Sequence, residues 1–334
     1  MSLSSIINNI PKAELHLHIE GSLTPELMWR LAKKHSVTLP YASVKEIEAA
    51  YNFEDLQSFL DLYYAGAGVL RDEEDFFTLM WEYLSRCHKE NIVHTEIMFD
   101  PQTHTERDIG FDVFMPGFLR AMDKAKQEYG ISSYLIMSFL RHLPESAAFE
   151  TLSEAEPYYK HITAVGLDSS ELGHPPSKFE RVFKKAKSLG FKIVAHAGEE
   201  GPASYIWEAI ELLDVDRIDH GVRCQEDKAL MALLRERQIP LTVCPLSNLK
   251  LCVIDDMKQH NIVELLNEGL LVTVNSDDPT YFGGYLNRNF EALDAALGMN
   301  KNQLQALVIN SFKASFLSED EKTHWIKEVN RHFS

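Results

Sequence analysis

The sequence predicts a closed (β/α)8 barrel, the TIM barrel of the α/β class, with extra helices after the first strand forming a lid. Eight strand-like stretches are each followed by a helix-length segment, which is typical of this fold. A length of 334 residues suits one large barrel or two domains. No linker, low-complexity tract or internal repeat is evident, so we expect residues 1–334 to form one domain. A doubly wound open sheet is the alternative. The predicted strands lie near 13–19, 91–99, 132–138, 163–168, 191–196, 217–220, 240–244 and 270–276.

Helix signals follow the predicted strands in order. Thr24 and Pro25 supply an N-cap residue and a proline at the first helical position. Residues 40–90 are longer than one helix and contain aromatic and helical segments, so we predict a lid insertion over the barrel mouth there. The segment 176–189 has an apolar face and ends at Gly190. The stretch from Asn300 onward is helical in pattern and should pack outside the barrel.

The bulk composition excludes several functional classes. Apolar residues make up 45% and charged residues 25%, as in ordinary globular proteins. A formal net charge of -17 argues against a nucleic-acid partner, because such a surface repels polyanions. We find no secretory signal and no apolar run long enough for a membrane span. The four cysteines show no close pairing and indicate free thiols of a cytoplasmic protein.

Chemically active side chains follow four of the predicted strands. His16 and His18 are two residues apart on the first strand, so both imidazoles project from one face. The fifth strand reaches His196, and the sixth ends in His220. The eighth is followed by the adjacent pair 277–278, two aspartates before a proline. Any one of these histidines would ordinarily be structural, but packing does not explain why four strand ends carry such groups.

His16, His18, His196 and Asp277 should converge inside the carboxyl mouth of one barrel. Neutral imidazoles and a carboxylate suit a zinc ion that keeps an open position for water. Zinc lowers the pKa of bound water, so this pattern predicts a hydrolase. The donor set alone also accommodates iron or manganese.

Five segments together resemble the adenosine/adenine deaminase family of metal-dependent barrels, in the family's order and over nearly the whole chain. They are His16-Leu17-His18-Ile19-Glu20-Gly21-Ser22, His196-Ala197-Gly198-Glu199, Asp219-His220-Gly221, Pro245-Leu246-Ser247-Asn248 and Ser276-Asp277-Asp278-Pro279. The resemblance implies one zinc ion per chain, held by His16, His18, His196 and Asp277.

The resemblance also implies the roles of the remaining site residues. Glu199 would protonate ring nitrogen 1 of an aminopurine, which requires a buried carboxyl with a raised pKa. His220 would orient and deprotonate the attacking water, with Asp277 beside it, and would stabilise the oxyanion. Asp278 would contact ring nitrogen 7, and Gly198 would belong to the substrate site.

Three residues bear on which aminopurine is used. Glu171 stands where adenosine deaminases usually carry a glycine, and its carboxylate could accept the hydrogen on nitrogen 9 of free adenine. A nucleoside would leave that carboxylate unpaired, which discriminates strongly. Glu20 stands where adenosine-specific members tend to carry an aspartate that contacts the sugar. Phe59 is a candidate for the apolar wall of the purine site, with the core of the lid as the other interpretation.

The segments 168–171 and 99–104 resemble the bacterial and fungal adenine deaminase branch. We therefore expect adenine to be hydrolysed to hypoxanthine and ammonia, a reaction of purine salvage. Alternatives are an adenosine or other 6-substituted aminopurine deaminase, another metal-dependent hydrolase, and a non-catalytic purine-binding protein. Deaminases with a cysteine-based zinc motif are excluded, because no Pro-Cys-x-x-Cys occurs. The expected partner is a small purine, and the sequence is compatible with a homo-oligomer without fixing the oligomeric state. It also leaves open lid motion and side activity on methylated adenines or cytokinins.

Overall fold

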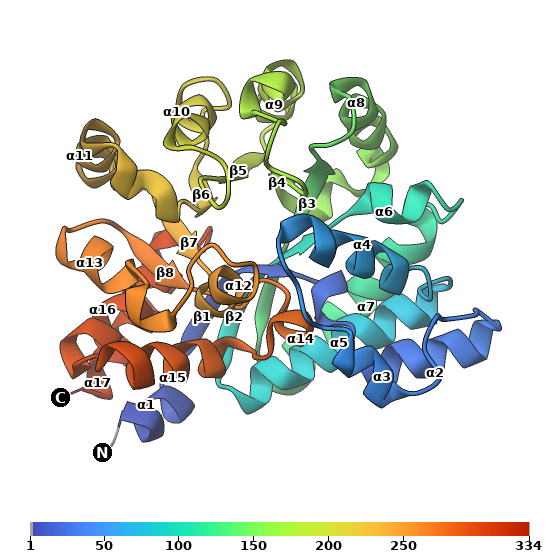
Figure 1. The fold of residues 1–334 in the computed structure, drawn as a ribbon, viewed down its shortest axis with the longest axis horizontal. Helices are drawn as coiled ribbons and strands as arrows, with labels where there is room; N and C mark the ends of the chain where they lie inside the picture. Colours follow the sequence, from blue (N-terminus) through green and yellow to red (C-terminus); the bar gives the residue numbers. More distant parts are fainter. Residues whose placement is uncertain (1–2, 334) are drawn as a thin grey trace.

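Eight parallel strands form a single sheet in the order β1 to β8, and helices surround it (Figure 1). The structure is a computed structural model, and it describes residues 3–333. Every predicted strand is present within a few residues of its expected bounds, so the predicted TIM barrel is confirmed. The strands are β1 (Lys12–His18), β2 (Ile92–Phe99), β3 (Ser132–Leu140), β4 (Ile162–Asp168), β5 (Lys192–Ala197), β6 (Arg217–His220), β7 (Leu241–Val243) and β8 (Val272–Val274).

The helices follow from local signals in the sequence. Thr24 caps α2 by accepting a hydrogen bond from the Leu27 N–H, and Pro25 opens the helix as predicted. The α-helices are α1 (Leu3–Asn9), α2 (Pro25–His35), α3 (Val44–Ala49), α4 (Leu56–Ala67), α5 (Glu73–Lys89), α6 (Pro101–Thr105), α7 (Phe111–Tyr129), α8 (Glu145–Glu154), α9 (Glu180–Ser188), α10 (Ala203–Glu211), α11 (Lys228–Arg237), α12 (Pro245–Lys250), α13 (Ile262–Asn267), α14 (Pro279–Phe282), α15 (Leu286–Leu297), α16 (Lys301–Ala314) and α17 (Glu319–Arg331).

The first and last strands meet through the segment that follows β8. The Asp277 N–H donates to the His16 carbonyl at 3.1 Å, and the His18 N–H donates to the Asp277 carbonyl at 3.0 Å. The Asn275 side chain accepts from the Leu15 N–H at 2.9 Å. These bonds bring the barrel to near closure and place Asp277 between the two histidines of β1.

Alternation along the strands divides the buried side chains between two faces. On β1, Ala13, Leu15 and Leu17 belong to the large apolar core beneath the helices. On the opposite face of the sheet, Arg217 is fully buried, donates to Glu96 at 2.6 Å and also donates to the Leu15 carbonyl at 3.1 Å. The barrel interior is therefore partly polar, with Arg217 and Glu96 paired in it.

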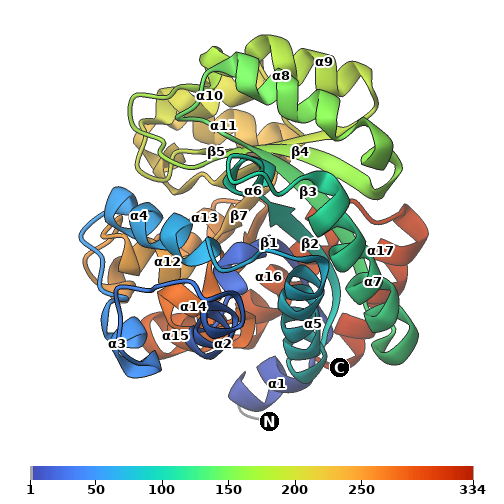
Figure 2. The ribbon, with the colours of Figure 1, turned by 90° about the vertical axis from the view of Figure 1, so that its right-hand side faces the viewer.

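Only part of the predicted lid covers the barrel. In the side view, α4 lies at the left of the barrel, whereas α17 lies at its right (Figure 2). The helix α5 instead packs on α7 and β2, with Phe76, Leu79 and Tyr83 fully buried, as an ordinary outer helix of the barrel does. The expectation of a lid over all of residues 40–90 is thus too broad, because the apolar face of α5 belongs to the outer layer. No helix within residues 3–333 is long and apolar enough to span a bilayer.

Candidate active site

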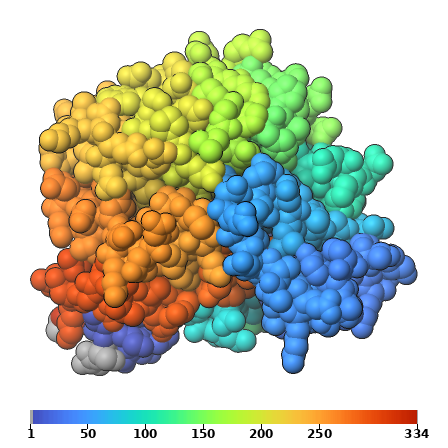
Figure 3. All heavy atoms as spheres, viewed as in Figure 1, coloured from blue at the N-terminus to red at the C-terminus, as the bar shows by residue number. Residues whose placement is uncertain are grey.

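A cavity lies at the carboxyl ends of the strands. Its floor comes from strand ends and its outer wall from α4, including Phe59. In the space-filling view, the blue residues of α4 and the orange residues around α12 meet over this end of the barrel (Figure 3). The lining residues are His18, Leu56, Phe59, Leu60, Tyr63, Tyr64, Asp100, Asp168, Ser169, His196, Glu199, His220, Leu251, Asp277, Asp278 and Phe282.

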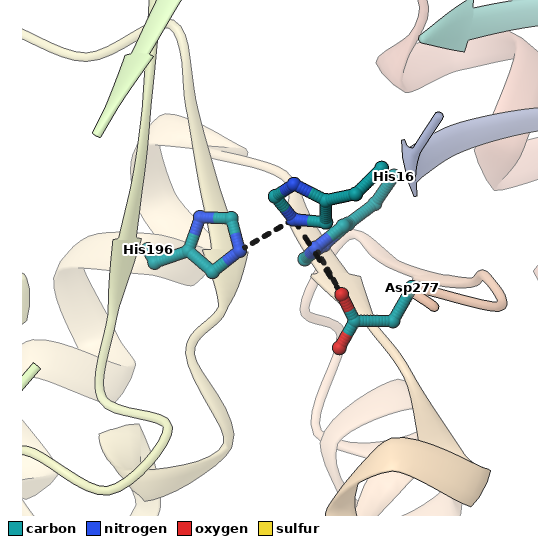
Figure 4. Close-up of side chains that lie close together, drawn as sticks. His16, His196 and Asp277 are labelled. Carbon is teal, nitrogen blue, oxygen red and sulfur yellow. Dashed lines mark hydrogen bonds and ion pairs between the residues drawn. The ribbon is translucent and has the colours of Figure 1, made fainter. Parts of the chain in front are cut away.

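The four predicted metal ligands come together at the base of this cavity. One ligand atom from each of His16, His18, His196 and Asp277 lies within 4.8 Å of all the others. His16 Nε2 is 3.3 Å from Asp277 Oδ1, and His18 Nε2 is 3.2 Å from His196 Nε2. The close-up shows His16, His196 and Asp277 turned toward one another (Figure 4). Three imidazole nitrogens converging with a carboxylate is a donor set that suits a divalent cation.

Electrostatics favour the ligating forms of His196 and Asp277, whereas, against the effect of burial, the acids around His18, Asp100 first among them, raise the pKa of that ring. Burial and the neighbouring histidines lower the pKa of His196 well below its usual range, which keeps its ring neutral. Burial alone would raise the pKa of Asp277, but the adjacent His16, His220 and His18 hold it well below its ordinary value. A neutral imidazole and an ionised carboxylate are the forms that bind metal.

Each imidazole ring also has a polar neighbour at its other nitrogen. His16 Nδ1 lies 3.2 Å from the Thr242 carbonyl, and His18 Nδ1 lies 3.4 Å from Asp168 Oδ2. His196 Nδ1 lies 3.7 Å from Asp219 Oδ2. Such outer contacts orient histidine ligands and raise their basicity.

Left-handed backbone turns direct the strand ends into the cavity. His220 and Asp277 both have φ near 62°, which is uncommon for residues other than glycine and concentrates at functional sites. Gly198 has φ 71°, and a Cβ there would lie 2.4 Å from Ile206 Cδ1. These positions let consecutive residues serve different purposes at each strand end.

Glu199 and His220 lie side by side above the cluster. His220 Nε2 is 3.5 Å from Glu199 Oε2 and 3.6 Å from Asp277 Oδ2. Burial, followed by the charges of Asp277 and other acids, raises the pKa of Glu199 well above its usual range. Burial lowers the pKa of His220 to about 3, so its ring is neutral. The pair therefore combines a protonated carboxyl, which can give a proton, with a neutral imidazole, which can accept one.

Asp278 is held against the turn that follows β1. A Cβ on Gly21 would lie only 1.9 Å from Asp278 Oδ1, so only glycine leaves room for this carboxyl. Asp278 Oδ1 is buried and has no hydrogen-bond partner among residues 3–333. Burial, with Asp277 next in effect, raises the pKa of Asp278 well above its usual value. A buried, unpartnered polar atom facing a cavity is available to a ligand.

Three predicted substrate contacts lie elsewhere. The Glu171 carboxylate accepts the N–H groups of residues 198–201 at 2.7 to 3.1 Å, which places it behind the loop rather than in the cavity. The expectation that Glu171 meets nitrogen 9 is therefore wrong, because four backbone amides occupy its oxygens. Gly198 likewise contributes its N–H to Glu171. Glu20 accepts from the Asp100 N–H at 3.3 Å and pairs with His104 at 2.8 Å, so it supports the cavity wall without lining it.

The cavity includes polar residues that our sequence-based prediction missed. Asp100 and Asp168 stand at the ends of β2 and β4, and Tyr63, Tyr64 and Ser169 line the wall beside them. The signal that could have found both aspartates is the one used for the histidines, since each directly ends a predicted strand.

Comparison with known proteins gives consistent matches. The family model described as Adenosine deaminase matches residues 11–332. The chain is 60% identical to the adenine deaminase of Acinetobacter baylyi, over 99% of this chain and 100% of that one. The crystal structure of adenine deaminase from Arthrobacter aurescens superposes with a TM-score of 0.95 at 46% identity, covering 96% of this chain and 98% of that one. A zinc-bound amidohydrolase from Burkholderia ambifaria shares the fold, with a TM-score of 0.90 at 24% identity over 99% of this chain and 93% of that one.

Proposed function

This chain belongs to the adenosine deaminase family, and we infer that it catalyses the hydrolysis of adenine to hypoxanthine and ammonia. The observation that carries the inference is the convergence of the four-residue donor set with Glu199, His220 and Asp278 at one cavity, in a chain 60% identical to an adenine deaminase. Relatives and site agree on one reaction class.

We propose zinc as the cofactor, held by His16, His18, His196 and Asp277. The donor set fits: three imidazoles and a carboxylate are typical of zinc hydrolases, and His16 Nε2 is a buried atom with no hydrogen-bond partner in the described chain. Bound zinc supplies a strong oxygen nucleophile from water at neutral pH.

The side chains of the protein accomplish the remaining steps. Glu199, protonated because it is buried beside other acids, gives its proton to ring nitrogen 1 as carbon 6 is attacked. His220, neutral and next to Glu199, orients the water and takes its proton. Asp278 faces the cavity with a free Oδ1 and engages ring nitrogen 7. His220 then passes its proton to the departing amino group, which leaves as ammonia, and the carbon 6 hydroxyl returns a proton to Glu199, so that a carbonyl remains at carbon 6.

An ultraviolet assay of adenine loss tests this proposal. Wild-type enzyme should use adenine more efficiently than adenosine, and Glu199→Gln should lower kcat by about 100-fold to 10,000-fold, because an amide cannot transfer the proton. Glu226→Gln, an exposed acid paired with Arg223, is the matched control and should retain activity. A Glu199→Gln variant as active as wild type would refute the assigned acid, and preference for adenosine would refute the substrate.

Removal of metal tests the cofactor separately. Dialysis against a chelator should abolish activity, one equivalent of zinc should restore it, and the bound metal should be measurable by mass spectrometry. An enzyme that stays active after complete metal removal would contradict the proposal.

We further propose that the chain is one catalytic domain in which α4 alone is the lid, since α4 lines the cavity while α5 packs outside. All four cysteines are free, which supports the reducing cytoplasm as the location.

A further inference from the structure

Glu171 binds the backbone amides of residues 198–201, and Glu20 binds the Asp100 N–H and His104, so neither is free to contact substrate. The edge of adenine that carries nitrogen 9 therefore still needs a partner. Apart from the metal-binding Asp277, the cavity is lined by the carboxyl groups of Glu199, Asp278, Asp168 and Asp100. Glu199 and Asp278 are the proposed partners of nitrogens 1 and 7. The remaining candidates for nitrogen 9 are therefore Asp168 and Asp100.

The two aspartates differ in what they face. Neither oxygen of Asp168 has a hydrogen-bond partner among the residues described, but Asp168 Oδ2 is 3.4 Å from His18 Nδ1, so this carboxylate is directed at the ligand ring. Asp100 Oδ1 is farther from the same nitrogen, at 3.9 Å, and Asp100 Oδ2 already accepts a hydrogen bond from the Tyr63 hydroxyl at 3.0 Å. Asp100 is only 3% exposed, and its Oδ1 has no hydrogen-bond partner among the residues described. Asp100 thus presents one anchored and one free oxygen at the cavity wall.

Asp100 lies on the side of the cavity where the five-membered ring is expected. Glu20 and Gly21 are consecutive in the turn after β1: Glu20 bonds the Asp100 N–H, and Gly21 packs directly against Asp278 Oδ1. Asp100 and Asp278 therefore flank the same turn. Nitrogens 7 and 9 belong to the same small ring, so the partner of nitrogen 9 should stand next to Asp278, the partner of nitrogen 7.

The position of Asp100 is fixed from behind. Glu20 is held by His104 at 2.8 Å, and His104 Nδ1 contacts Arg107 at 2.9 Å. Arg107 in turn donates to the carbonyls of Gly68 and Leu70, just after α4. This network anchors the end of β2 to the lid helix, so Asp100 cannot easily withdraw to admit a larger substrate.

We propose that Asp100 accepts the hydrogen bond from the N–H at nitrogen 9 of adenine and thereby selects the free base over N9-substituted purines. This proposal rests on the proposed deamination of adenine. An acceptor-only carboxylate complements an N–H donor. With a nucleoside or a 9-alkylpurine, a carbon replaces that hydrogen and leaves the buried carboxylate unpaired. Sites built around a substrate N–H reject analogues without it by about 10,000-fold or more.

Kinetics with adenine and 9-methyladenine test the assignment. Wild type should favour adenine in kcat/KM by at least about 1,000-fold. Asp100→Ala should lower kcat/KM for adenine and reduce this selectivity by about 100-fold. Asp123→Ala, the same substitution at an exposed aspartate on α7, is the matched control and should leave the selectivity within about three-fold of wild type.

Two further measurements separate selection of the base from a structural effect. Bound metal should be unchanged in Asp100→Ala but reduced in Asp168→Ala, which faces a ligand histidine. If Asp100→Ala does not fold, Asp100→Asn preserves volume, and its selectivity should still fall by at least ten-fold. A folded Asp100 variant with wild-type selectivity, or one that loses metal instead, overturns the inference. A wild-type enzyme inactive on adenine would refute the proposed function itself.

Discussion

Replacing Glu171 by glutamine should loosen the loop that carries Glu199. Glu171 Oε1 accepts the Gly198 N–H at 2.7 Å, and Oε2 accepts from residues 199, 200 and 201 at 3.1, 2.8 and 2.7 Å. A carboxylate can satisfy all four donors. A glutamine amide cannot, because its NH2 group must face at least one backbone N–H.

The magnitude follows from these contacts. The best orientation of glutamine keeps its oxygen at the Oε2 position and retains three bonds, each weakened from a charged to a neutral bond, roughly 1 kcal/mol apiece. The Gly198 N–H loses its acceptor, which costs about 1–3 kcal/mol for a buried donor. Together these terms come to about 4–6 kcal/mol, and because neighbouring terms are not fully additive we expect the free energy of unfolding to fall by about 4 kcal/mol.

Urea denaturation measures the stability, and kcat with adenine reports on the loop. Glu171→Gln should lower both, since Glu199 is part of the segment that loosens, whereas Glu236→Gln, an exposed acid on α11, should change neither. The selectivity for adenine over 9-methyladenine should persist. Unchanged stability together with lost selectivity would refute this reasoning and indicate that Glu171 contacts nitrogen 9 of adenine.

Three other changes probe the site and the barrel. Gly21→Ala should lower kcat/KM about 100-fold at unchanged metal content, because the added Cβ would lie 1.9 Å from Asp278 Oδ1 and displace that carboxyl. Normal activity in steady-state kinetics would contradict this packing. The pH profile of kcat/KM should fall on the alkaline side as Glu199 deprotonates, because burial raises its pKa and only the protonated form is active; Glu199→Gln should lack that limb. Arg217→Met should lower the urea-derived free energy of unfolding by about 3 kcal/mol, because it removes the cation paired with buried Glu96 and leaves that carboxylate only His94 and the Phe316 N–H. The double variant with Glu96→Leu should recover most of the loss. Full stability in the single variant would show that the buried pair is not needed.

The sequence predicted the strand framework well, because each strand is a short apolar run bounded by helix signals. Convergence of His16, His18, His196 and Asp277 then followed from topology alone, since parallel strands in a barrel end at one mouth. The same rule applies to Asp100 and Asp168, which also stand at strand ends. Each is a single acidic residue outside any repeated pattern, so the sequence did not single it out.

Side-chain direction after the strand ends was beyond sequence reasoning. Ser169 adopts φ 74°, and the chain beyond β4 then carries Glu171 toward the loop after β5 instead of the cavity. Glu20 is turned toward His104 by the short 3-10 turn at residues 20–22. Such local backbone choices depend on tertiary partners, which no spacing of residues along the chain encodes.

The near-closure of the barrel through Asp277 has a consequence for biosynthesis. Two of the proposed metal ligands come from the first strand and one from the segment after the last, so the proposed set spans residues 16 to 277. A growing chain can hold His16 and His18 together early but gains the carboxylate only when most of the polypeptide has left the ribosome. Capture of the ion is therefore tied to completion of the fold, and truncated products are left with an incomplete coordination set.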